Sequence, residues 1–189
     1  MPTPNPEVDP RLVQAEPLLV TRPVRPSKTQ LFEMLASVID RNWYSNFGPL
    51  HQALEAALRT HLHADRICLM NNGTQALTTA LRALKIRGEV ITTPFTFPAT
   101  PHAIEWASAT PIFADVDSRH MTLDPSAIEA AVTPRTEAIL GVHVYGIPCD
   151  VEAIERIAKK HHLAVVYDAA HAFNTEYLGR PLHSFGDAT

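Results

Sequence analysis

The sequence predicts an α/β fold in which a mainly parallel sheet is covered by helices on both faces. Two observations lead to this prediction. Short apolar runs alternate along the chain with longer segments of helical periodicity, as in repeated βαβ units. In addition, polar turns follow three of the apolar runs, and the carboxyl ends of strands are where open parallel sheets bind their ligands.

Length and composition fit a globular protein. The 189 residues suffice for one domain with a sizeable core or for part of a larger one. A net charge of −4 without any basic run argues against a nucleic-acid or membrane-surface partner. No stretch reaches the length of a membrane span and no secretion signal is visible, so we expect a cytoplasmic protein. Cys68 and Cys149 lack CxxC spacing and are expected to be inert buried thiols.

The chain divides into a proline-rich lead-in and a region of alternating elements. Residues 1–26 carry many of the 16 prolines and are expected to form an extended arm. Residues 27–189 are expected to form one incomplete domain. Because no helix closes the last βαβ unit before Thr189, we expect a fragment of a longer protein.

The expected elements follow from apolar periodicity. Helices are expected over 27–39, 49–62, 75–85, 98–106, 128–132 and 151–161. Strands are expected over 67–70, 90–92, 111–116, 139–145 and 163–167.

The first candidate site is the turn Asn71-Asn72-Gly73-Thr74-Gln75, between an expected strand and an expected helix. Free backbone N–H groups and the positive end of a helix dipole make such a turn a seat for phosphate. Gly73 permits close approach of a ligand to the backbone, and the Thr74 hydroxyl adds a donor. The alternative is that Thr74 is only a helix cap.

The second candidate site is Thr93-Pro94-Phe95-Thr96-Phe97-Pro98, which follows the next expected strand. Aromatic side chains in a proline-stiffened turn can stack on a planar ring. The alternative is that the two phenylalanines fill the core beneath a loop.

The third candidate site is Asp168 with His171, after the apolar run Leu163–Tyr167. An ionised aspartate opposite a pyridine nitrogen keeps that nitrogen protonated, and His171 would share a helical face with Asp168. The alternative is a helix-capping aspartate and a core imidazole. Together, the three turns offer what pyridoxal phosphate (PLP) requires: a phosphate seat, an aromatic plate and an acid for the ring nitrogen.

Other chemistry finds less support. His61 and His63 face different sides of a helix, and the adjacent His161 and His162 lie at a helix end, so we expect no metal site. The sequence has neither GxGxxG nor GxxxxGK[ST], which argues against dinucleotide oxidoreductases and P-loop enzymes.

Several short segments, in a fixed order, also point to one known family. The segments are Asn46-Phe47-Gly48-Pro49, Asn72-Gly73-Thr74-Gln75-Ala76-Leu77, Gly88-Glu89-Val90-Ile91-Thr92-Thr93-Pro94-Phe95-Thr96-Phe97, Thr133-Pro134-Arg135-Thr136, Val142-His143-Val144-Tyr145-Gly146, Tyr167-Asp168-Ala169-Ala170-His171-Ala172 and Ser184-Phe185-Gly186-Asp187. On these segments, residues 20–189 resemble the PLP-dependent sugar aminotransferases of the DegT/DnrJ/EryC1/StrS family. Residues 149–152 and 167–173 are most similar to the enzymes that form TDP-4-amino-4,6-dideoxyglucose.

The resemblance implies a fold and a set of site residues. The fold is the N-terminal part of the large domain of a fold-type I PLP-transferase, truncated before the catalytic lysine segment and the C-terminal domain. Gly73, Thr74 and the backbone of Gln75 would bind the cofactor phosphate, and Phe97 would stack on the ring.

By the same resemblance, the catalytic residues within the chain are Asp168 and His171. Asp168 would pair with the pyridine nitrogen. His171 occupies a position that is glutamine in many relatives and would lie near the ring hydroxyl. The lysine that forms the Schiff base is expected a few residues after Thr189, so the chain alone is expected to be inactive.

The implied activity is ping-pong transfer of an amino group, with glutamate as donor, to a nucleotide-linked keto-sugar in polysaccharide biosynthesis. The full-length protein is expected to be a homodimer. Two alternatives remain open at this point: a sugar dehydratase on the same scaffold, in which histidine replaces the lysine, and a non-catalytic regulatory protein that keeps the fold.

Overall fold

The computed structural model describes residues 23–189, so most of the expected N-terminal arm lies outside the described residues. The chain divides into two compact units, residues 1–50 and 51–189. The first unit contains helix α1 (Lys28–Arg41), which confirms the helix expected from residue 27. Ser27 caps its N-terminus by accepting a hydrogen bond from the Gln30 N–H, and Asn42 ends it in the left-handed region.

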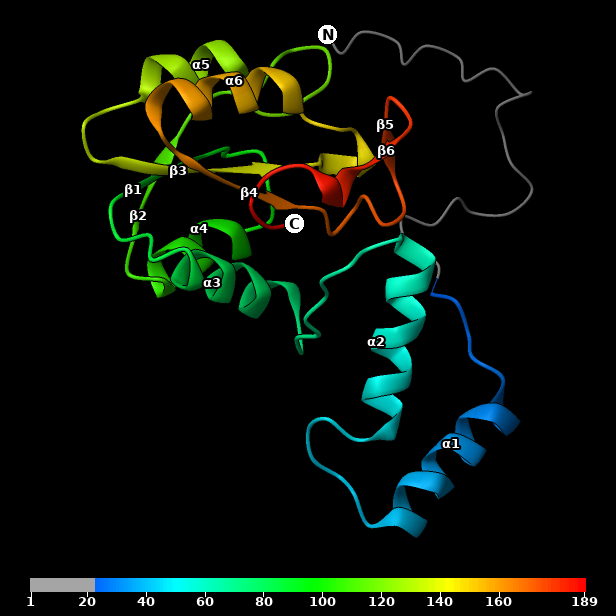
Figure 1. The fold of residues 1–189 in the computed structure, drawn as a ribbon. Coiled ribbons are helices and arrows are strands. Elements are labelled where there is room, and N and C mark those ends of the chain that lie inside the picture. Colours follow the sequence, from blue (N-terminus) through cyan, green and yellow to red (C-terminus); the bar gives the residue numbers. More distant parts are fainter. Residues whose placement is uncertain (1–22) are drawn as a thin grey trace, which may run out of the picture. The chain divides into compact units, whose positions relative to one another are not determined.

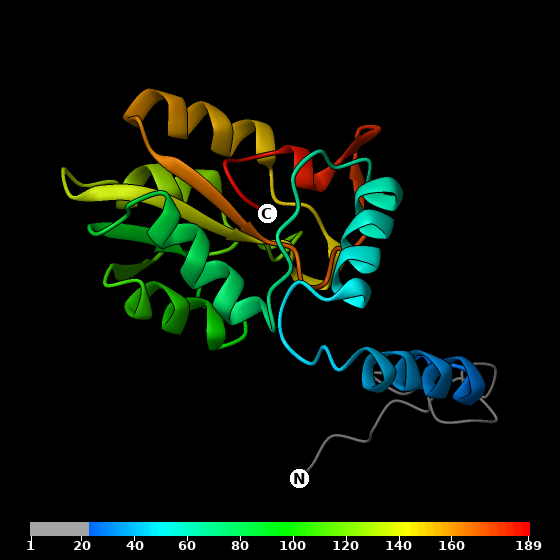
Figure 2. The same cartoon turned by 60° about the horizontal axis from the view of Figure 1, so that its bottom comes forward.

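The second unit is built on a four-stranded parallel sheet with strand order β2-β1-β3-β4. The strands are β1 (Glu89–Thr92), β2 (Thr110–Phe113), β3 (Thr136–Val142) and β4 (Ala164–Asp168). Helices α3 (Gly73–Ala83) and α4 (Ala99–Trp106) cover one face, and α5 (Pro125–Ala131) and α6 (Val151–His161) cover the other (Figures 1 and 2). The expected α/β architecture is thereby confirmed. Helix α2 (Pro49–Leu62) begins where the first unit ends and has the expected bounds.

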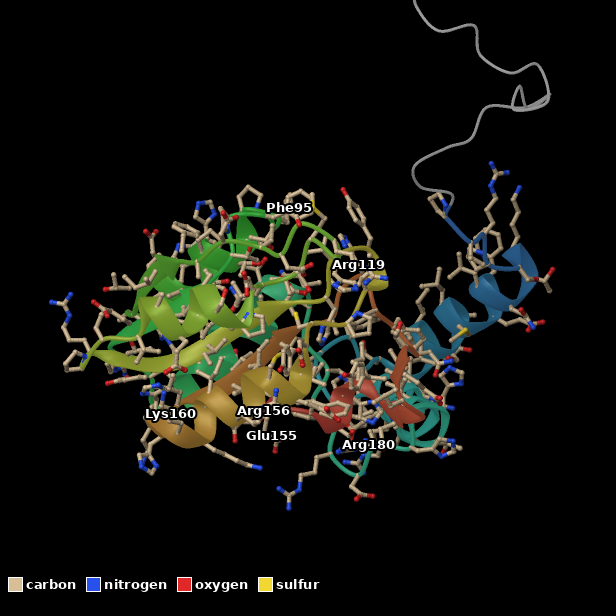
Figure 3. The ribbon with its side chains drawn as sticks, turned by 90° about the horizontal axis from the view of Figure 1, so that it is seen from above. Phe95, Arg119, Glu155, Arg156, Lys160 and Arg180 are labelled. Carbon is tan, nitrogen blue, oxygen red and sulfur yellow. The ribbon has the colours of Figure 1, made fainter. Side chains whose placement is uncertain are left out.

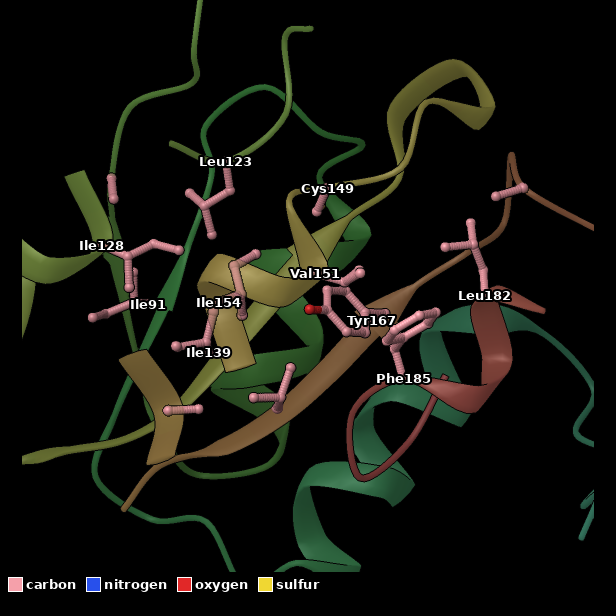
Figure 4. Close-up of a cluster of buried hydrophobic side chains, with 14 residues drawn as sticks. Ile91, Leu123, Ile128, Ile139, Cys149, Val151, Ile154, Tyr167, Leu182 and Phe185 are labelled. Carbon is pink, nitrogen blue, oxygen red and sulfur yellow. The ribbon is translucent and has the colours of Figure 1, made fainter. Parts of the chain in front are cut away.

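Two apolar clusters, one on each face of the sheet, form the core. Along β4, Val165 and Tyr167 belong to the cluster beneath α5 and α6, whereas Val166 belongs to the cluster beneath α3 and α4. Successive strand side chains point to opposite faces, so a strand buried on both faces is apolar throughout. Figure 4 shows the first cluster, in which Phe185 lies beside the Tyr167 ring. Full burial of one such large side chain contributes roughly 1.5–3 kcal/mol.

The strand expected over residues 67–70 is wrong. These residues have no neighbouring strand in the sheet to bond to, and Cys68 is exposed rather than buried. Cys149 is buried as expected, and burial raises the pKa of its thiol to about 12.

Several element ends differ from the expected ones for local reasons. Helix α5 starts at Pro125 rather than at residue 128, because the Asp124 side chain accepts the Ser126 N–H (2.8 Å) and caps the helix. Strand β3 stops at Val142 rather than at residue 145, because Tyr145 takes a left-handed conformation (φ 54°) within the short 3-10 helix η2 (Val144–Gly146).

The last part of the chain contains a hairpin that the sequence analysis missed. Strands β5 (Glu176–Tyr177) and β6 (Arg180–Pro181) are joined by a two-residue turn in which both residues have positive φ. The short helix η3 (Leu182–Ser184) follows. The Arg180 guanidinium stacks 4.2 Å from the centre of the Phe185 ring, on the side of the molecule where Glu155 and Arg156 project from α6 (Figure 3).

No helix among residues 23–189 combines the length and the apolar character that a membrane crossing needs. The same residues hold no group of three or more His, Cys, Asp or Glu side chains that could bind a metal ion.

His143 is a fully buried titratable residue next to the sheet. Its ring stacks on Tyr167 with 4.7 Å between ring centres, and its Nδ1 accepts the Cys149 N–H at 3.0 Å. Its Nε2 is buried without a partner among the described residues. Burial lowers the pKa of His143 from 6.5 to about 4, so the imidazole is neutral at physiological pH.

The burial of His143 predicts that the folded protein loses stability at acidic pH. Between pH 6.5 and 4, the unfolded chain binds a proton at His143 that the folded chain does not, so the free energy of unfolding falls as the pH drops. The loss approaches about 3 kcal/mol and is complete near pH 4. We expect His143→Asn, which keeps an acceptor for the Cys149 N–H but cannot titrate, to flatten this slope in urea unfolding curves. If the slope were unchanged in this variant, His143 would not be the source of the acid sensitivity.

Candidate functional site

A cavity of about 560 Å³ opens at the carboxyl end of the sheet. Its walls come from the N-terminus of α3, the loop after β1, the end of β3 with η2, and the segment after β4. Five of the six residues expected in the site line it: Gly73, Thr74, Phe97, Asp168 and His171. Gln75, the sixth, is not among the lining residues.

The N-terminus of α3 is capped by Asn72 and not by Thr74. The Asn72 side chain accepts the Gln75 N–H at 2.9 Å, and its carbonyl accepts the Ala76 N–H. The alternative in which Thr74 caps the helix is therefore wrong. The amides of Gly73 and Thr74, in the first turn, have no intrahelical acceptor and lie at the positive end of the helix dipole.

Gly73 borders open space. A Cβ atom added there would have no other atom within 4 Å, so its side of the cavity has room for a ligand. The Gln75 amide, by contrast, is already bonded to the cap, which removes it as a free donor in this structure.

The two phenylalanines of the second turn differ in their surroundings. Phe97 lines the cavity and is 76% exposed, so it does not fill the core. Phe95, labelled in Figure 3, is half-buried and meets the Tyr145 ring edge-on, with 6.2 Å between ring centres. Only Phe97 therefore offers a largely open ring face.

Asp168 ends β4 and faces the cavity. Its Oδ1 accepts the Ala170 N–H at 3.0 Å, and its Oδ2 accepts the Thr100 hydroxyl at 3.4 Å. Thr100 is fully buried and also bonds to the Thr96 hydroxyl at 2.8 Å. The carboxylate is thus held by two donors.

His171 lies in a turn and not on a helix. Residues 169–175 contain no helix, so the alternative of Asp168 as a helix cap and the expected shared helical face are both wrong. His171 is exposed, which excludes a core imidazole. Its Nδ1 accepts the Tyr145 N–H at 3.2 Å, and its ring lies parallel to the Tyr145 ring, with 6.0 Å between centres and 6° between planes.

Sequence reasoning missed the supporting residues of this cavity. Thr96 belonged to the second candidate turn without a role of its own, and Thr100 was not singled out. The available signal was that these two hydroxyl residues are four apart at the start of a helix. Tyr145 stood in one of the family segments, but the sequence assigned it no role, because its role depends on a left-handed backbone conformation.

Comparisons with known proteins identify the family of the chain. A family model described as DegT/DnrJ/EryC1/StrS aminotransferase matches residues 27–189. The chain is 48% identical over 160 residues to a dTDP-4-amino-4,6-dideoxy-D-glucose transaminase of Escherichia coli, covering 85% of this chain and 43% of that protein. The chain therefore spans less than half the length of this relative.

The chain is also similar in structure to parts of solved proteins. A crystal structure of DesI in the presence of its TDP-sugar product aligns with a TM-score of 0.84 and 42% identity, over 90% of this chain and 44% of that one. NtdA of Bacillus subtilis, with bound cofactor PMP, aligns with a TM-score of 0.74 and 28% identity, over 90% of this chain and 41% of that one.

The cap at α3 predicts that substitutions at Asn72 and at Thr74 differ in their effect on the free energy of unfolding. Asn72→Ala should lower the free energy of unfolding by about 1 kcal/mol, because it removes the acceptor for the Gln75 N–H. Asn72→Asp should be close to neutral, and Thr74→Val should cost little stability. Urea unfolding of the three variants checks this. Greater destabilisation by Thr74→Val than by Asn72→Ala would indicate that Thr74, and not Asn72, caps the helix.

Proposed function

The chain belongs to the DegT/DnrJ/EryC1/StrS aminotransferase family, and we propose that it forms the cofactor-binding part of a PLP-dependent aminotransferase acting on a nucleotide-linked keto-sugar. The observation that carries this proposal is the meeting of Thr74, Phe97, Asp168 and His171 around one cavity. These residues come from three segments of the chain that are far apart in sequence. The names of the transaminase and DesI relatives support the substrate class.

The residues present fit the cofactor. The open space at Gly73 and the unbonded first-turn amides of α3 suit a phosphate group, with the Thr74 hydroxyl as a further donor. The exposed ring of Phe97 suits stacking on a planar heterocycle. At about 560 Å³, the cavity is of a size typical for small-molecule sites.

In this proposal, PLP supplies an electron sink for the amino-group transfer. Asp168 presents its carboxylate to the ring nitrogen, because the Ala170 N–H and the Thr100 hydroxyl bond to the carboxylate and orient it. Phe97 covers one face of the ring and excludes water from it. The α3 N-terminus anchors the phosphate.

The remaining parts of the proposal rest on the family resemblance. The amino donor is glutamate, and the catalytic lysine lies in a segment that follows Thr189 in the full-length protein. That protein is a homodimer in the cytoplasm. A dehydratase on the same scaffold would carry histidine in place of the lysine, and a non-catalytic relative would not transfer amino groups.

The activity is tested with the full-length protein that contains this chain. We expect it to convert dTDP-4-amino-4,6-dideoxy-D-glucose and 2-oxoglutarate to the keto-sugar and glutamate. Product analysis by chromatography separates the candidates. Loss of water from the sugar without glutamate formation would favour the dehydratase, and binding of PLP without turnover of any keto-sugar nucleotide would favour a non-catalytic protein.

The phosphate seat predicts the effect of a single methyl-for-hydroxyl exchange. Thr74→Val removes one donor to a charged group at nearly constant volume and should weaken PLP binding by about tenfold or more. Thr79→Val, an exposed position on the same helix outside the cavity, is the matched control and should bind PLP like the wild type. Spectral titration with PLP measures both. Equal affinities for the two variants would remove Thr74 from the site.

A further inference from the structure

The wall of the cavity contains a backbone donor aimed at an imidazole. Tyr145 and Gly146 both have positive φ, at 54° and 79°. This left-handed pair brings η2 against the loop after β4, so closely that a Cβ atom on Gly146 would lie 3.0 Å from the His171 carbonyl oxygen. In this conformation, the Tyr145 N–H donates to Nδ1 of His171 at 3.2 Å.

This hydrogen bond determines where a neutral His171 carries its proton. A ring nitrogen that accepts a hydrogen bond has no proton of its own, so the proton resides on the other nitrogen, Nε2. Among residues 23–189, the bond to Nδ1 is the one hydrogen bond of the His171 ring, and Nε2 has no bonded group. Nε2 is therefore a donor without a protein acceptor, on a side chain that lines the cavity beside Asp168.

The orientation of the imidazole is held by aromatic contacts as well. The Tyr145 ring lies parallel to the His171 ring, 6.0 Å away, and the Phe95 ring meets Tyr145 edge-on at 6.2 Å. Because Tyr145 contacts His171 through both its amide and its ring, rotation of the imidazole would break two interactions. The contacts thus fix the direction of the Nε2–H bond.

We propose that Tyr145 is a positioning residue that holds His171 as the Nε2–H tautomer, so that His171 donates a hydrogen bond to an anionic oxygen of the ligand in this cavity. The identity of that oxygen rests on the proposed function, in which it is the ring oxygen of PLP. The tautomer itself does not depend on the cofactor, since both partners belong to the chain.

The proposal predicts which side chains can replace His171. A glutamine offers a carbonyl oxygen to the Tyr145 N–H and an NH₂ group to the ligand, so it reproduces both roles. A glutamate of the same length can accept from the Tyr145 N–H but has no donor for the ligand. His171→Gln and His171→Glu are therefore a matched pair of equal length. The first keeps a neutral hydrogen-bond donor, and the second has no donor and carries a negative charge.

The tautomer is measured first, in the protein without cofactor. Nitrogen-15 NMR of labelled histidine at a pH where the rings are neutral distinguishes Nε2–H from Nδ1–H, and the His171→Gln variant identifies the His171 signals by their loss. We expect His171 to be the Nε2–H tautomer, with exposed His102 as an internal reference. A proton on Nδ1, or an even mixture of tautomers, would overturn the proposal.

The donor role is then measured by titration with PLP. We expect His171→Gln to bind within about threefold of the wild type and His171→Glu to bind at least about tenfold more weakly, because it cannot donate and adds a negative charge. Equal binding by His171→Glu would refute the donor role. If the wild type itself binds no PLP, the proposed function fails, while the NMR result still decides the tautomer.

Discussion

β3 and β4 run side by side with Val142 opposite Asp168, and the bond from the His143 amide to the Asp168 carbonyl (3.0 Å) continues this pairing beyond the strands. Gly141 allows the pair to form, because a Cβ there would lie 2.9 Å from the Tyr167 ring. A slip of one residue would turn the apolar side chains of β4 to the wrong faces. It would also separate Tyr145 from His171, so the cavity wall depends on this register.

Most of the fold could be predicted from the sequence because the parallel strands are buried on both faces and the helices have clear apolar periodicity. α2 and α6 have the expected bounds. The failures have a common cause, since residues 67–70, the end of β3 and the β5–β6 hairpin all depend on partner strands or on positive φ angles. An apolar pattern in one segment contains neither kind of information.

The candidate site was predicted as residue types at strand ends, and five of its six residues line one cavity. The sequence could not show which group caps α3, because Asn72 and Thr74 are both good capping residues. It also could not show the groups that orient Asp168 and His171, since Thr100 and Tyr145 act through contacts across 68 and 26 residues of chain. Other family segments are structural: Thr133 and Arg135 bond to the buried Glu89 and tie β1 to the start of β3.

In the proposed function, the Asp168 carboxylate faces the nitrogen of a pyridine ring, and Asp168→Asn in the full-length protein probes this interaction. Asparagine keeps an acceptor for the Ala170 N–H and should preserve the fold and cofactor binding. Without the charge, rapid-mixing absorbance measurements with the amino donor should show a loss of orders of magnitude in the half-reaction rate. A variant that reacts at close to the wild-type rate would show that the Asp168 charge does not act on the ring nitrogen.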